Sequence, residues 1–407
     1  MDIFNTADIL IPAKGDMSKW AVIACDQFTS EPEYWAECER LVGDADSALR
    51  LMLPEAWLES DRAEGAEGRI NAEMERCLRE NVFRVLEKSF VYLERQQSDG
   101  RIRRGLVGAV DLEQYDFTPG SHAAIRSTED TVADRLPPRV KVRKGAALEM
   151  PHAMVLMNDP EDAVLGALEA RKERFEKVYD FELMQGSGHI RGWRVSGGEA
   201  EAVSAAIRAL TETADMAMAM GDGNHSLATA RLCWLDIREK LSESQRENHP
   251  ARYALVELNN IHEAAIDFEP IHRILLDTET DAFLNEAERF FEEASRDGES
   301  HAIRCITAEG QREIIVRGLT IGETIGAAER FALDYLKRHG GRIDYIHGDD
   351  TVAAMGRERG SCAMVLPAMD KTELFTSVER SGPFPRKSFS IGHARDKRFY
   401  LECRKIK

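Results

Sequence analysis

The sequence predicts a mixed α/β protein in which helices pack on a mixed sheet, and three observations predict this fold class. Apolar runs typical of buried strands are interspersed with helical patterns along the whole chain. Two pairs of strands are joined by short turns, which is typical of β-hairpins. The chain has 407 residues, of which 43% are hydrophobic, so it can bury a core larger than that of one small lobe. We expect two lobes, residues 1–260 and 261–407.

The first lobe begins with an apolar run that turns polar, followed by a helix for which Ser30 is the expected N-cap. A hairpin is expected around Asp99-Gly100. Pro137-Pro138 is expected to break any helix that begins at Thr128. The predicted strands are 20–27, 90–95, 105–115, 151–157 and 216–220, and the predicted helices are 78–94, 161–178, 199–213 and one that starts after residue 223.

The second lobe is predicted to alternate strands and helices in the same way. Two strands and a turn are expected within 252–275, followed by an acidic helix over 278–294. The segment 301–319 predicts a hairpin because two alternating runs flank a Glu-Gly turn. A helix is expected at 321–338, and three further strands lie within 362–369, 387–394 and 398–406.

Composition and charge exclude several classes of protein. The formal net charge of -18 opposes binding to duplex nucleic acid, which is itself a polyanion. Seven cysteines without a CxxC pair indicate neither a disulfide framework nor a zinc site. The start of the chain does not resemble an export signal, and no apolar run is long enough to cross a membrane. We therefore expect a cytoplasmic protein without a membrane partner.

The segment Gly221-Asp222-Gly223-Asn224-His225-Ser226 is the sharpest local motif. Glycines on both sides of Asp222 allow a tight turn, and Asn224 is expected to cap the helix that follows. The N–H groups of the first helical turn would then face an anion such as phosphate. Asp222 would hold a magnesium ion or accept a proton from a hydroxyl group. The alternative is an ordinary capped helix with a surface histidine.

A second candidate is the polar end of the first predicted strand. Asp26 comes directly after the apolar run, and Glu31 follows a few residues later. Open α/β sheets bind ligands at the carboxyl ends of their strands, so either carboxylate is a candidate base. The alternative for Asp26 is a turn or cap aspartate. Cys25 has no basic neighbour in sequence that would activate it as a nucleophile.

Cationic and hydroxyl side chains offer a third set of candidates for an anionic substrate. Arginine forks match phosphate and carboxylate oxygens, and four arginines gather between residues 126 and 143. The alternative is that most of them pair with the many acids of the chain. The candidate substrate-binding residues are Arg126, Thr128, Glu129, Arg139, His272, Arg273, Lys387 and Ser388, with Arg135 and Arg143 as further cations of the same segment.

Several long segments in one order resemble domain-of-unknown-function family 1015, in its bacterial branch with the GDGNHS form. They are WAVIACDQFTSEPEYW, RSTEDTVADRLPPRVKVR, YDFELMQGSGHIRGW, GDGNHSLATA, ALVELNNIH with EPIHRI, DYIHGDD and PRKS. Residues 222–226 are also similar to the Asp-Gly-His-His-Arg motif of the ParB and sulfiredoxin-like superfamily, which includes kinases of free serine. Here Asn224 replaces the first histidine and Ser226 the arginine.

The resemblance implies a ParB/sulfiredoxin-like core and a phosphotransferase or phosphohydrolase acting on a small hydroxylated metabolite such as serine or phosphoserine. It implies a nucleotide (ADP or ATP) at the GDGNHS turn, magnesium at Asp222, and Asp26 or Glu31 as the base. The missing arginine argues against conventional binding of the nucleotide phosphates, unless an arginine of residues 126–143 replaces it. The alternatives are a nucleotide-sensing regulator without turnover, and a different hydrolase in which the turn is structural.

Overall fold

The computed structural model describes residues 2–131 and 136–407, and the chain divides into two compact units. Unit 1 contains residues 1–127, 131–266 and 393–407, and unit 2 contains residues 128–130 and 267–392. Unit 2 resumes close to the expected boundary after residue 260. The last residues, 393–407, fall in unit 1 although the expected second lobe ran to the end of the chain.

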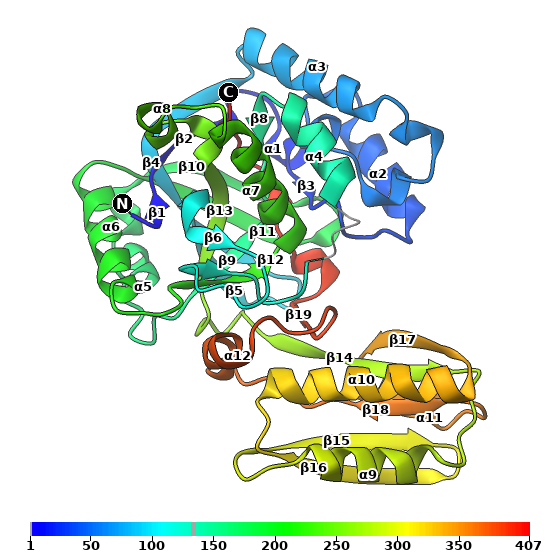
Figure 1. Ribbon diagram of the computed structural model, residues 1–407. Coiled ribbons are helices and arrows are strands. Elements are labelled where there is room, and N and C mark those ends of the chain that lie inside the picture. Colours follow the sequence, from blue (N-terminus) through cyan, green and yellow to red (C-terminus); the bar gives the residue numbers. More distant parts are fainter. Residues whose placement is uncertain (1, 132–135) are drawn as a thin grey trace. The chain divides into compact units, whose positions relative to one another are not determined.

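Unit 1 is built on an 11-stranded mixed sheet with the strand order β10-β11-β4-β5-β13-β9-β12-β7-β6, in which β1 also pairs with β5 and β2 with β4 (Figure 1). Most pairs are antiparallel, whereas β13–β9, β12–β7 and β6–β7 are parallel. The strands are β1 Phe4–Asn5, β2 Ala7–Pro12, β4 Phe83–Gln96, β5 Ile102–Asp111, β6 Tyr115–Asp116, β7 Ile125–Arg126, β9 Met154–Met157, β10 Glu176–Glu182, β11 His189–Val195, β12 Met218–Asp222 and β13 Tyr253–Asn260.

Both faces of this sheet are buried, because successive side chains of a strand point to opposite faces. Phe90 and Tyr92 of β4 belong to one hydrophobic cluster, whereas Val91 and Leu93 belong to another. Helices supply the other side of each cluster. The helices of unit 1 are α1 Met17–Trp20, α2 Pro32–Val42, α3 Ala66–Arg79, α4 Leu136–Gly145, α5 Leu165–Glu169, α6 Gly198–Thr211, α7 Asn224–Arg238 and α8 Glu243–Glu247.

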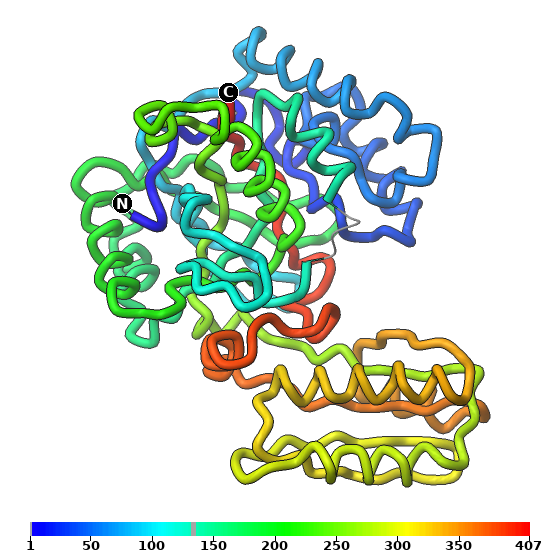
Figure 2. The backbone as a smooth tube through the Cα atoms, in the orientation of Figure 1, coloured from blue at the N-terminus to red at the C-terminus, as the bar shows by residue number. Residues whose placement is uncertain are grey.

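The C-terminal segment returns to unit 1 and pairs with early strands. Strand β20 (Phe399–Tyr400) pairs with β3 (Val22–Ile23), and β21 (Arg404–Lys405) pairs with β8 (Leu148–Glu149). The indole of Trp20 donates to the Leu401 carbonyl at 2.8 Å. Figure 2 shows this segment, drawn in red, running among the blue and green parts of the chain.

Unit 2 contains a second sheet with the order β16-β15-β18-β14-β17, in which β19 also pairs with β14. Helices α9 and α10 pack against each other and against this sheet through an aromatic group that includes Phe283, Phe331 and Tyr335 (Figure 1). The elements are β14 Phe268–Leu276, α9 Phe283–Ala294, β15 Ser300–Thr307, β16 Gly310–Arg317, α10 Ile321–His339, β17 Arg342–His347, α11 Asp349–Gly356, β18 Cys362–Val365, α12 Glu373–Ser381 and β19 Phe389–Ile391.

The predicted mixed α/β fold is confirmed, and so are most of the expected elements. The hairpin at Asp99-Gly100 joins β4 to β5, the second hairpin is β15–β16, and a strand, turn and helix follow one another at β12 and α7. Among the described residues, no helix is both long and apolar enough to cross a membrane.

Two predicted helices and the predicted N-cap of α2 are wrong. The expected helix 78–94 is mostly strand, because the pairing of β4 with β11 overrides local helical propensity. The expected helix 161–178 contains the short helix α5 and a 3-10 turn at Lys172–Arg174, and β10 begins at Glu176. Pro137 and Pro138 lie in the described first turn of α4, where proline is tolerated, and Thr128 is not part of a helix. Glu31, not Ser30, is the N-cap residue of α2.

Candidate functional site

The pairing of β3 with β20 brings the end of the first strand beside the C-terminal segment. The strands are antiparallel, with Phe399 opposite Ile23, and the Ala24 N–H donates to the Arg398 carbonyl at 3.0 Å. The next residues on each strand, Cys25 and Lys397, therefore continue side by side. Because of this register, Asp26 and Lys397 lie near each other although they come from opposite ends of the sequence.

A second strand pair places His152 beside the GDGNHS turn. In the antiparallel pair β9–β12, Asp222 lies opposite Met154, shortly after His152. The backbone at Gly223 has a φ of 77° and passes so close to Ala153 that a β-carbon would lie 2.8 Å from the Ala153 Cα atom. Glycine is required at this position both for its left-handed conformation and for this close approach.

Two ionic contacts bring the four segments into one cluster. Lys397 Nζ lies 3.1 Å from Asp222 Oδ2, and His152 Nε2 lies 3.8 Å from Asp26 Oδ2. The side chains are partly buried, with 27% of the Asp26 side chain and 9% of the His152 side chain exposed. We call Asp26, His152, Asp222 and Lys397 the four-residue cluster.

Electrostatics keeps Asp26 ionised. Burial alone would raise the pKa of its carboxyl group, but the charge of His152, a hydrogen bond from Gln27 and the charges of Lys397 and Arg139 lower the pKa below its ordinary value. The opposite applies to the neighbouring thiol, because burial and the Asp26 charge raise the pKa of Cys25 to about 11. Cys25 is therefore a neutral thiol at physiological pH and a poor nucleophile.

Tyr400 orients His152 from the side opposite Asp26. Its hydroxyl lies 2.8 Å from His152 Nδ1 and 3.1 Å from Cys25 Sγ. One hydrogen lies between the phenol oxygen and Nδ1, and Nε2 is the ring nitrogen that faces Asp26. Burial raises the pKa of Tyr400 well above its ordinary value, so the phenol retains its proton.

A cavity of about 450 Å³ opens next to the cluster. Its wall includes Cys25, His152 and Tyr400, together with Ser226 and Thr229 from the first turns of α7. Helices α3 and α4 and the segment before α3 form the rest of the wall, which is largely aliphatic. The volume falls within the range of small-molecule sites.

A buried ionic network supports the segment that carries Lys397. The guanidinium of Arg398 pairs with Glu257 and Glu402, and Arg103 lies 3.2 Å from Glu257. Burial opposes ionisation of Glu257, but the charges of Arg103 and Arg398 lower its pKa to about 2. The network therefore remains charged near neutral pH and fixes the backbone beside Lys397.

The GDGNHS turn differs from the expectation in one respect. Gly223, not Asn224, is the N-cap residue of α7, and no side chain caps this helix. Asn224 is the first helical residue, and its Oδ1 accepts a hydrogen bond of 2.8 Å from the Ser127 hydroxyl. Gly221 lies at an irregularity in β12, while His225 is half-buried and its carbonyl accepts from Thr229 at 2.7 Å. The expected cap is therefore wrong.

The remaining candidates of unit 1 have different positions. Arg139 lies in the cavity wall and pairs with Glu55. Arg126 is buried and donates to Asp215 and to the Ala123 carbonyl, both at 2.9 Å. Glu31 is exposed at the start of α2, and within the described residues its side chain makes no hydrogen bond or ion pair with the four-residue cluster. Arg143 pairs with Glu149, and Arg135 lies outside the described residues.

The other six candidates belong to unit 2, where their contacts are local. His272 is fully buried, with Nδ1 accepting from the Leu366 N–H at 3.0 Å and Nε2 3.1 Å from Asp349. Arg273 is fully buried and donates to Glu329. The Thr128 carbonyl accepts a hydrogen bond from the Phe384 N–H, and the Glu129 carboxylate accepts one from the Ser388 N–H. The ammonium of Lys387 lies over the ring of Tyr345.

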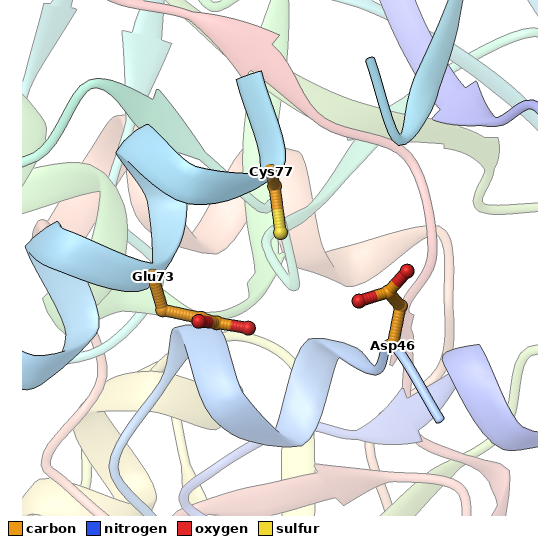
Figure 3. Close-up of side chains that lie close together, drawn as sticks. All are labelled: Asp46, Glu73 and Cys77. Atoms are coloured by element: carbon orange, nitrogen blue, oxygen red, sulfur yellow. The ribbon is translucent and has the colours of Figure 1, made fainter. Parts of the chain in front are cut away.

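Figure 3 shows Asp46, Glu73 and Cys77, whose side chains point toward one another. In the described part of the chain this is the one group of three side chains with the spacing of metal ligands. Arg76 already forms ion pairs with both carboxylates. Burial raises the pKa of Cys77 to about 11, so the thiol remains protonated. The group is an arginine-bridged pair of acids.

Sequence reasoning missed His152, Lys397 and Tyr400. Each lies in a segment already predicted as a strand or directly before one, at 151–157 and 398–406. A polar residue flanking a buried strand was the signal that identified Asp26, and it applies equally to His152 and Lys397. Their proximity to Asp26 depends on strand register, which single segments do not reveal.

Comparison with known proteins identifies a matching protein family. The family model described as "Protein of unknown function (DUF1015)" matches residues 8–334, and no curated protein matches the chain. Similar solved structures include a conserved hypothetical protein from Pyrococcus furiosus, with 10% identity, coverage of 72% of this chain and 92% of that one, and a TM-score of 0.35.

A free serine kinase in complex with AMP has 11% identity, coverage of 73% of this chain and 91% of that one, and a TM-score of 0.38. SbnI with a C-terminal truncation, from Staphylococcus aureus, has 8% identity, coverage of 70% and 82%, and a TM-score of 0.36. TM-scores this low carry no argument about activity.

Proposed function

We propose that this chain, which belongs to the DUF1015 family, is a phosphoryl-transfer enzyme acting on a small hydroxylated metabolite such as serine or phosphoserine. The observation that carries the proposal is the four-residue cluster, in which an ionised carboxylate and an imidazole adjoin a lysine at the N-terminus of a helix. Phosphoryl transfer depends mainly on positioning and on neutralising charge.

Asp26 is the proposed base. Its lowered pKa makes it a carboxylate near neutral pH, so it can accept a proton from a substrate hydroxyl. As that proton moves to Asp26, the hydroxyl oxygen bonds to phosphorus and the bond from phosphorus to the leaving oxygen breaks. With a nucleotide donor the leaving group is the shortened nucleotide. With water as acceptor, Asp26 takes the proton from water, and the serine oxygen of phosphoserine leaves and receives that proton from Asp26. His152, oriented by Tyr400, holds the hydroxyl next to Asp26.

Lys397 and the first turn of α7 are the proposed phosphate-binding groups. The ammonium of Lys397 is mostly buried, with 11% of its side chain exposed, so its charge is only weakly screened by water. Helix α7 has 15 residues, and its N-terminus attracts anions. Asp222 keeps Lys397 in place, and Arg139 adds a second cation at the cavity wall.

The residues around Asp222 do not form a preassembled magnesium site. Asp222 Oδ2 contacts Lys397, and Oδ1 accepts a hydrogen bond of 2.8 Å from the Gly223 N–H. The group of three potential metal ligands in the described ranges lies elsewhere, at Asp46. Lys397 therefore supplies the neutralising charge in this proposal, and no step is assigned to magnesium.

ADP or ATP is the proposed phosphoryl donor, because the GDGNHS turn is similar to the serine-kinase motif.

Phosphorus NMR tests the proposal. The chain is incubated with L-serine and ATP or ADP, and separately with O-phosphoserine alone. We expect transfer or release of phosphate with the wild type and a loss of roughly a hundredfold in Asp26→Asn, the scale of one catalytic acid-base group. Asp16→Asn is the matched control, because Asp16 is an exposed N-cap residue of α1 in the same unit.

Two outcomes would contradict transfer at this site. Full activity in Asp26→Asn would exclude Asp26 as the base. Binding of ADP or ATP without any change in the phosphorus spectrum would instead support the second hypothesis, a nucleotide-sensing protein without turnover.

A further inference from the structure

We infer that the cavity beside the four-residue cluster binds an aliphatic portion of the phosphoryl acceptor, so that among small hydroxylated acceptors those with a methylene-rich group bind more tightly than serine itself. This inference rests on the proposed function and names its substrate class. At about 450 Å³, the cavity exceeds what a hydroxymethyl group beside Asp26 would occupy.

The wall of the cavity is aliphatic along most of its extent. Its apolar members come from α3, α4 and the coil segments near them, and they include Leu51, Leu53, Leu58, Met74, Val142 and Met150. Methionine side chains are flexible and polarisable, so they adapt to ligands of different shape. Burial of methylene groups against such a wall is favourable in proportion to the apolar area removed from water.

The charged groups of the wall already pair with one another. Arg139 pairs with Glu55, and Arg143 donates to Glu149 at 2.6 Å. Glu149 also accepts from Arg404 at 2.7 Å. Tyr400 is the one aromatic side chain of this wall within the described residues, and its hydroxyl contacts His152 and Cys25.

Apart from these paired charges and the polar end of the cavity, the described polar side chains of the wall are Ser226 and Thr229. The Thr229 hydroxyl donates to the His225 carbonyl, which leaves it mainly an acceptor. A nucleobase needs donors and acceptors matched to its edge, because buried polar groups without partners are costly. An aliphatic group has no such requirement, so this wall favours methylene groups over a base.

The polar end of the cavity fixes the orientation of the acceptor. His152, Cys25 and Tyr400 form this end, and the His152 imidazole lies 3.8 Å from the Asp26 carboxylate. A hydroxyl group at this end lies next to His152, which contacts the proposed base, while the carbon chain extends along the aliphatic part of the wall. The cavity thus selects acceptors by the length of their apolar part.

Calorimetric titration of the full chain with primary alcohols from ethanol to 1-hexanol tests the inference. We expect the dissociation constant to fall roughly fourfold for each added methylene, as expected for burial in an apolar site. Leu53→Trp should fill the cavity and abolish this dependence, since Leu53 is half-buried in its wall. Leu333→Trp is the matched control, because Leu333 is 50% exposed in unit 2. Val142→Phe replaces Leu53→Trp if the latter does not fold.

Affinity that is independent of chain length in the wild type, or that persists unchanged in Leu53→Trp, would overturn the inference. So would a loss of adenosine binding in Leu53→Trp with hexanol binding intact, since that would assign the cavity to a base. Failure of the proposed function has a different signature. Alcohols would then bind with the expected dependence on length while the phosphorus spectra show no transfer.

Discussion

Lys397 Nζ lies 3.1 Å from Asp222 Oδ2, so the C-terminal segment supplies a charged group directly to the GDGNHS turn. The pairing of β20 with β3 and the ionic network of Arg398 hold this segment in place. Unit 1 is therefore incomplete without residues 393–407.

Gly223→Ala should be more destabilising than an alanine at a comparable glycine. Gly223 and Gly65 both precede a helix in the left-handed conformation, with φ of 77° and 64°. That conformation costs alanine about 1–2 kcal/mol. At Gly223 the new methyl would also lie 2.8 Å from Ala153 Cα, whereas at Gly65 its nearest neighbour is the flexible Arg69 side chain at 3.5 Å. Urea unfolding of both variants measures the difference, and equal losses would argue against the close packing of the turn on Ala153.

Asp26→Asn should remove a pH-dependent part of the stability. Asp26 has a lower pKa in the folded chain than its ordinary value of 3.8. Its charge therefore stabilises the fold fully above pH 3.8, and this contribution is lost as the pH falls through the lower folded pKa. The wild type should be more stable than Asp26→Asn at pH 5–6, with a difference that shrinks below about pH 4. Urea midpoints across this range test the sign, and a difference that grows on acidification would contradict it.

Glu257→Gln should destabilise the fold strongly. The side chain is buried between Arg103 and Arg398, and neutralising it removes the carboxylate charge that both buried cations share, although Arg398 keeps its pair with Glu402. The expected loss is about 3–5 kcal/mol in the free energy of unfolding. Glu37→Gln, in a solvent-exposed pair with Arg40, should change the free energy of unfolding far less.

The charge of Glu257 also predicts a pH dependence. Its pKa falls from 4.5 to about 2 on folding, so its contribution is complete above pH 4.5 and is lost as the pH falls toward 2. Thermal unfolding of the two variants provides the comparison. If Glu257→Gln proves as mild as Glu37→Gln, the buried network does not hold the C-terminal segment.

Local sequence patterns predicted the elements whose conformation is decided by nearby residues. Asp99-Gly100 marks the turn between β4 and β5 because such pairs favour tight hairpins. Thr320 and Glu323 cap α10 with the two hydrogen bonds of a capping box, which explains why the start of this helix was predicted well. Gly223 marks the turn before α7 by its positive φ. The family was also evident from the order of its motifs.

Strand pairing between distant segments determines the features that the sequence did not predict, namely the conformation of residues 78–94 and the positions of His152 and Lys397. The expected helix over 78–94 is mainly strand β4, since α3 ends at Arg79 and Asn81 adopts a φ of 54° that interrupts it. The candidate site also depends on strand pairing between distant segments. Asp26 and Asp222 were visible as candidates, but His152 and Lys397 join them only through the registers of β9–β12 and β3–β20.

Calorimetric titration of ADP with the wild type and Lys397→Met tests most directly whether the four-residue cluster binds phosphate. Lys172→Met is the matched control, because Lys172 forms a partly buried pair with Glu94 in the same unit. Loss of a charge-assisted contact should raise the dissociation constant of ADP about 10–100-fold in Lys397→Met. The control should bind like the wild type. ADP binding of equal affinity in Lys397→Met and the wild type would contradict a phosphate site at Lys397 and Asp222.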